Sequence, residues 1–181
     1  NEERLPFAKW LIRFTDRMFG AMTNDSLLAR AFRRYIIFTL AGIVLRLPFV
    51  RPMIFKVVSQ IWYSYHGMSL SKNDSRQRLR FRAGDRLPYL ADHNIYNHLN
   101  SASFHLLHIS DRSQNNLQAN VNRVFPFPVK AIDCRLLPEW RRLGVRKELY
   151  VFVRPDNYIA LLFDKWDEKR ISKYLSTYFI V

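Results

Sequence analysis

The sequence predicts an α/β protein of the α+β kind, with an N-terminal helical segment followed by a mixed domain. Three observations predict this. Apolar residues recur at three and four positions through residues 1–70, strand and helix patterns alternate from residue 95, and the apolar stretch 149–163 is interrupted by a single group of turn formers. With 181 residues, of which 49% are hydrophobic, the chain is able to bury a core.

Residues 149–163 have the composition of a β-hairpin. Two apolar strands flank Pro155, Asp156 and Asn157. Pro155 can hold φ at the first turn position, and Asn157 can enter the left-handed region that closes a short hairpin with a bulge. Because the strands show almost no polar alternation, we expect both faces of the sheet to be covered, by helices.

A closing helix is predicted over residues 166–180, with Asp164 or Asp167 as its cap. Its apolar stripe consists of Trp166, Ile171, Tyr174, Leu175 and Tyr178.

Three apolar helices are predicted at the N-terminus. The first is amphipathic and covers residues 4–22, the second begins near Leu27 and ends at Pro48 and Pro52, and the third covers residues 53–65. Helices this apolar need a surface to pack on, either in this chain or in a neighbour.

Between the helices and the hairpin, the pattern indicates a linker and a second domain. Residues 71–83 are polar and basic, which predicts a linker between a helical segment at 1–70 and a domain at 84–181. Within that domain we expect a helix or turn from Ile95, a helical stretch about 113–124 and a helix or loop around Trp140. The expected strands are 104–109 and 129–134.

The net charge of +14 and the isoelectric point near 10.3 require a cause. Nucleic acid, an anionic membrane surface and an acidic partner domain would each attract such a chain. No nucleic-acid-binding motif is recognisable, so nucleic acid is disfavoured. The longest uncharged run, 35–45, is about half of a membrane span, and the N-terminus lacks a signal-peptide layout, although contact with a membrane surface stays open.

The sequence predicts no catalytic, cofactor-binding or metal-binding residue. The single cysteine, Cys134, is interpreted as core filler in a strand, and it favours a reducing, cytoplasmic location. Of the clustered histidines, His105 and His108 should point to opposite faces of a strand, which disfavours a metal site. The other two histidines of this group are His93 and His98.

Nucleotide binding and acid–base catalysis also lack a pattern. The chain has no Gly-x-Gly that would let backbone amides approach a pyrophosphate. Scattered carboxylates such as Asp133, Glu139 and Glu148 show no catalytic spacing.

Several motifs resemble the phenol-hydroxylase-like FAD-dependent monooxygenases, the class A aromatic hydroxylases. The hairpin is similar to their Leu-Val-Arg-Pro-Asp-Gly-Tyr/His-Val-Ala segment, with Asn157 where that family usually has glycine. Residues 1–8, 14–19 and 58–71 resemble further family motifs in the same order. Gly84-Asp85 is not assigned to their flavin motif, because Arg86-Leu87-Pro88 follows it.

The resemblance implies a thioredoxin-like α/β sandwich for residues 84–181, which the order of strands and helices also favours. Redox exchange is excluded because the chain lacks CxxC. Ser110-Asp-Arg-Ser113 stands where the cysteines would be. The residue directly before Leu149, where redox-active members present a cis-proline, is not a proline.

For the parent protein, the resemblance implies a flavoprotein oxidoreductase that hydroxylates an aromatic or polyketide-like substrate with FAD, NAD(P)H and O₂. This chain would hold no cofactor and would be its C-terminal structural and assembly region, packed against the missing FAD and substrate domains. A homo-oligomer stays open. The alternative is a free-standing basic module that binds an acidic partner or an anionic membrane surface.

Overall fold

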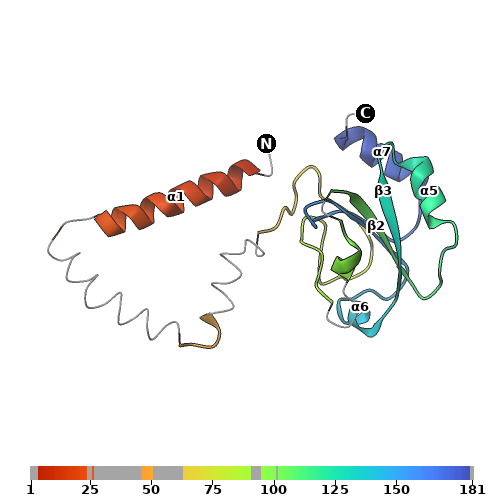
Figure 1. The fold of residues 1–181 in the computed structure, drawn as a ribbon, viewed down its shortest axis with the longest axis horizontal. Helices are drawn as coiled ribbons and strands as arrows, with labels where there is room; N and C mark the ends of the chain where they lie inside the picture. Colours follow the sequence, from red (N-terminus) through yellow and green to blue (C-terminus); the bar gives the residue numbers. More distant parts are fainter. Residues whose placement is uncertain are drawn as a thin grey trace. The chain divides into compact units, whose positions relative to one another are not determined.

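The computed structural model describes residues 4–23, 26, 46–50, 63–90, 95–100 and 102–179 (Figure 1). The chain divides into two compact units, Asn1–Tyr63 and Ser64–Val181.

The first unit contains helix α1 (Arg4–Thr23), within one residue of the predicted 4–22. Trp10 and Phe14 stack with ring centroids 5.4 Å apart, as side chains four residues apart on one helix face can do. Among its described side chains, the large apolar ones that are exposed are Leu5, Trp10, Leu11, Ile12, Phe14 and Phe19. No helix in the described part of the chain combines the length and apolarity that crossing a bilayer requires.

The predicted second and third helices lie almost wholly outside the described residues. The exception is residues 63–65, which were expected to end the third helix and are not helical. Here the Tyr65 amide donates to the carbonyl of Gly84 (2.8 Å), so this stretch bonds to a distant segment instead of to its own preceding turn.

The second unit is built on a five-stranded mixed sheet in the order β1-β5-β4-β2-β3. Its strands are β1 (Lys72–Asp74), β2 (Phe104–Ser110), β3 (Val129–Arg135), β4 (Leu149–Val153) and β5 (Ile159–Phe163). The β2–β3 and β1–β5 pairs are parallel, whereas β4 is antiparallel to both β2 and β5. The predicted mixed α/β class is confirmed.

The helices described in this unit are η2 (Ile95–His98), α5 (Leu117–Val124), α6 (Pro138–Arg142) and α7 (Glu168–Tyr178). Helix α5 begins four residues after the predicted start, because Ser113 and Gln114 are bonded to Asp133 of β3. Asp167 caps α7, accepting a hydrogen bond from the Arg170 amide (3.2 Å).

The two faces of the sheet are covered differently. Helices α5 and α7 lie side by side on one face (Figure 1), where Val121 and Ile171 pack with Phe152. The other face is covered mainly by the irregular segment 79–90 together with η2 and α6. The expectation that helices cover both faces therefore holds fully for the face under α5 and α7, and only in part for the other.

The hairpin forms as predicted. Every residue of β4 and β5 is buried, and Asn157 has φ +65°, the left-handed conformation expected of it. The register shifts between Phe152 and Val153, which is the predicted bulge.

The stretch 71–83 differs from the linker that the sequence indicates. Residues Lys72–Asp74 are an edge strand of the sheet, paired in parallel with Leu161–Phe163. The chain then passes under Gly144, where a Cβ would lie 2.3 Å from the Arg78 carbonyl oxygen. Only one side of a short edge strand is paired, so such a strand can carry charged side chains. Its composition therefore resembles that of a solvated linker.

Candidate functional site

A polar cluster lies where β2, β3 and β4 meet, around the buried side chains of His108 and Tyr150. The register places His108 opposite both Asp133 and Tyr150. The His108 ring is 2% exposed, with Nδ1 2.8 Å from Asp133 Oδ1 and Nε2 2.9 Å from Glu148 Oε1. We call His108, Asp133, Glu148, Tyr150, Ser113 and Gln114 the His108 cluster.

The acids of the His108 cluster are well supplied with donors. Asp133 Oδ2 accepts from Ser113 Oγ (2.5 Å) and from the Gln114 amide (3.2 Å), while its other oxygen faces His108. Burial alone would raise the pKa of the Asp133 carboxyl, but the hydrogen bonds from Ser113, His108 and Gln114 outweigh burial and hold that pKa below its ordinary value.

Tyr150 closes the His108 cluster on its apolar side. Its ring stacks on His108 with centroids 4.7 Å apart, and its hydroxyl lies 2.9 Å from Glu148 Oε1 and 3.1 Å from Gln114 Oε1. Burial and then the hydrogen bond to Glu148 raise the pKa of this phenol. The hydroxyl therefore stays protonated and serves as a donor at neutral pH.

The geometry of the His108 cluster suits structural cross-linking of three strands. A catalytic serine needs its hydroxyl bonded to a base, but Ser113 donates to Asp133, and both nitrogens of His108 face carboxylates. Each ring nitrogen is within hydrogen-bond distance of one carboxylate oxygen, so the ring bridges β3 and the residue that precedes β4.

Two residues of the His108 cluster lie at positions that the family resemblance singles out in the sequence. Ser113 ends the segment 110–113, and Glu148 directly precedes Leu149. Both residues take part in the hydrogen-bond network, Ser113 with Asp133 and Glu148 with His108.

The other titratable candidates are placed separately. His105 lies on the opposite face of β2, where its Nε2 accepts from the Asn100 amide (3.1 Å), as the predicted alternation requires. Burial, and then the charge of Lys130, lower the pKa of His105. Among the described residues, which omit His93, no three metal-ligating side chains converge.

Cys134 is buried on β3, as predicted for core filler. Burial, and then the nearby Asp133 carboxylate, raise the pKa of its thiol to about 12. A thiol held protonated at neutral pH is a poor nucleophile.

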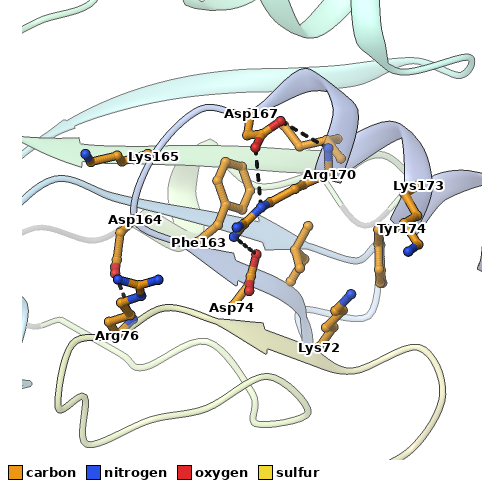
Figure 2. Close-up of a pocket in the computed structure, with 12 residues that line it drawn as sticks. Lys72, Asp74, Arg76, Phe163, Asp164, Lys165, Asp167, Arg170, Lys173 and Tyr174 are labelled. Carbon is orange, nitrogen blue, oxygen red and sulfur yellow. Dashed lines mark hydrogen bonds and ion pairs between the residues drawn. The ribbon is translucent and has the colours of Figure 1, made fainter.

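The second candidate site is an open cleft of about 540 Å³ between β1, β5 and α7, which we call the α7 cleft (Figure 2). Its acidic side chains are Asp74, Asp164 and Asp167, and its basic side chains are Lys72, Arg76, Lys165, Arg170 and Lys173. Its inner wall is formed by Leu161, Phe163, Ile171 and Tyr174, all of them buried.

The acids of the α7 cleft are already engaged. Arg170 reaches Asp74 (3.1 Å) and Asp167 (3.3 Å), as Figure 2 shows. Asp164 accepts from Ser75 Oγ (2.6 Å) and from the Arg76 amide (2.7 Å). Burial would raise the pKa of Asp164, but these hydrogen bonds, with that from the Gln77 side chain, hold it below its ordinary value.

The sequence missed both sites. Asp133 and Glu148 were noted only as scattered carboxylates, and the structure brings these two to His108 but leaves Glu139 outside the cluster. One signal was available: His108 is one of two histidines in a mainly apolar strand, and a buried polar side chain requires partners. Which partners it would have depends on the strand register.

Comparison with known proteins gives structural matches only. No protein-family model matches the chain, and no curated protein matches it. RebC, a rebeccamycin biosynthetic enzyme solved with reduced flavin, matches 97% of this chain with 34% of its own length, at 19% identity and a TM-score of 0.58. RebC-10x, soaked with chromopyrrolic acid, matches 97% of this chain with 35% of its own, at 19% identity and a TM-score of 0.58.

PieE, a flavin-dependent monooxygenase solved with FAD and substrate, matches 88% of this chain with 31% of its own length, at 17% identity and a TM-score of 0.47. The matches to the RebC chains, at 19% identity and a TM-score of 0.58, show a shared fold. The chain thus has the fold of part of a flavin enzyme. It spans about a third of the length of the RebC chains.

Proposed function

We propose that this chain is the C-terminal structural and assembly region of a FAD-dependent aromatic monooxygenase. The observation that carries the proposal is the extent of the fold match, which takes in 97% of this chain but only 34% of RebC. A region that fits so completely into a larger flavin enzyme is expected to be one part of such an enzyme. Flavin binding and catalysis would then belong to the remainder.

Two features of the chain support a structural role. The sequence has no Gly-x-Gly with which to hold a dinucleotide. The exposed apolar side chains of α1, among them Ile12 and Phe19, are of the kind that a neighbouring domain would cover. FAD, NAD(P)H and the missing N-terminal domains are accordingly assigned to the parent enzyme.

Expression of the complete reading frame tests this proposal. The full-length protein should bind FAD and oxidise NAD(P)H in the presence of an aromatic substrate, and its coding sequence ahead of Asn1 should include a Gly-x-Gly-x-x-Gly βαβ unit. Removal of residues 64–181 should reduce stability or change the oligomeric state measured by light scattering. Stoichiometric flavin on the isolated 181-residue chain would contradict the proposal.

A second candidate is a basic interaction module that binds an acidic partner or an anionic membrane surface. The excess of basic side chains around the α7 cleft favours it. Flotation of the chain with anionic vesicles at low and high salt tests the membrane form of this candidate, since binding by exposed charges weakens as salt screens them.

A further inference from the structure

The α7 cleft carries positive charge that its own acids do not neutralise. Arg170 is bonded to both Asp74 and Asp167, and Asp164 is held by the segment 75–77. Three exposed lysines lining the cleft have no acidic partner among the described residues: Lys72, Lys165 and Lys173. A ligand for the cleft should therefore be anionic.

The inner wall of the α7 cleft adds an apolar requirement. Phe163 and Tyr174 reach the cleft from β5 and α7, and Lys72 and Lys173 lie near Tyr174 (Figure 2). A volume of about 540 Å³ is within the range of small-ligand and peptide side-chain pockets. A fitting ligand should combine an apolar side chain with negative charges around it.

The spacing of charges favours separate carboxylates over one compact dianion. The same cleft is lined by Asp74 and Asp164, whose carboxylates would repel a doubly charged phosphate more strongly than a single carboxylate. Arg170, the residue type that grips phosphate with two hydrogen bonds, is already bonded to two acids. Lysines are flexible point charges that can each meet a single carboxylate.

The sheet edge beside the α7 cleft favours an extended ligand. Strand β1 is outermost in the sheet order and pairs only with β5 among the described strands. The outer edge of such a strand presents backbone donors and acceptors, to which an extended peptide can add as a further strand.

From these four features, we propose that the α7 cleft binds an extended acidic peptide segment that carries apolar side chains, with its carboxylates on Lys72, Lys165 and Lys173. The proposal deepens the second candidate function by assigning a site and a ligand class. It stands independently of the monooxygenase assignment.

Fluorescence anisotropy with the 181-residue chain tests the proposal. The probe is a labelled peptide in which Glu alternates with Leu and Phe. The double variant Lys72→Gln/Lys173→Gln should bind it about tenfold more weakly at about 0.15 M salt, because two charge-assisted contacts are lost. The matched control is Lys147→Gln/Lys169→Gln, which removes the same charge from exposed lysines outside the cleft, one of them on α7 itself.

Four outcomes would overturn the proposal. They are absence of peptide binding, equal weakening in the cleft variant and in the control, equal affinity for an all-Glu peptide, and displacement of the probe by inorganic phosphate at equal charge concentration. Binding to anionic vesicles is measured as well, with the same variants. If the vesicles bind through the cleft lysines and the peptide does not, the ligand is a lipid surface and the peptide assignment is wrong.

Discussion

The His108 cluster and the α7 cleft are both built from acids and bases on the same face of one sheet, yet they differ in the burial of the central base. The His108 side chain is 2% exposed, whereas the Arg170 side chain is 65% exposed. The acids are partly exposed in both networks, with Asp133 at 30% and Asp74 at 36%. Burial strengthens an ion pair and makes an unpaired charge costly, while exposure leaves charges screened and replaceable. The first arrangement suits holding strands together, and the second suits binding.

A stacked aromatic pair connects the two regions. Tyr150 stacks on His108 at one side and on Phe163 at the other, with centroids 4.7 Å and 4.9 Å apart. Phe163 in turn lines the α7 cleft. The same sheet face therefore carries one network around a buried base, His108, and another around an exposed base, Arg170.

The largest expected effect is the loss of His108. His108→Ala removes a buried ring and its hydrogen bonds to two carboxylates, and should lower the free energy of unfolding by about 3 kcal/mol, measured by urea titration. Arg141→Ala is the control, because its ion pair with Asp111 is exposed on both sides and should contribute less than about 1 kcal/mol. Equal costs for the two variants would remove the distinction between the regions.

The next effect concerns Asp133 and acid stability. Asp133→Asn should cost about 2 kcal/mol at neutral pH, since it disturbs three hydrogen bonds. Because the folded pKa of Asp133 lies below 3.8, its stabilisation is complete above 3.8 and is lost as the pH falls through the lower folded value. The wild-type unfolding free energy should therefore fall more steeply than that of the variant below this pH, and parallel curves would contradict this.

Asp164 should have an intermediate effect, because this acid of the α7 cleft accepts three hydrogen bonds from the segment 75–77. Asp164→Asn weakens the attachment of Ser75 and Gln77 to the end of β5 and should cost about 1 kcal/mol. Hydrogen exchange should show reduced protection of the β1 amides with the rest of the sheet unchanged. Unchanged protection would mean that β1 does not depend on this carboxylate.

The smallest effect is expected for the exposed lysines. Lys72→Gln/Lys173→Gln should change the free energy of unfolding by less than about 0.5 kcal/mol, as exposed side chains without ion partners contribute little to stability. Thermal and urea unfolding of the same preparation used for binding provide the measurement. A large loss of stability would show that these lysines support the fold.

Local patterns allowed much of the fold to be predicted. The strands β2 and β3 and the hairpin were recognised from β-branched and aromatic runs, and Asn157 from the demands of its turn. Strand β1 was missed, since three charged or polar residues carry no apolar alternation. The candidate sites were missed as well, because spacing in sequence does not reveal cross-strand neighbours.

The sequence by itself determined the types of the elements from β2 to α7, the turn of the hairpin and the burial of Cys134, because these depend on side chains within a few positions of one another. Only the tertiary structure decided that His108 meets Asp133 and Glu148, and that Lys72 faces the same cleft as Lys173. Such meetings follow from strand register, which is set by the packing of the whole sheet against its helices.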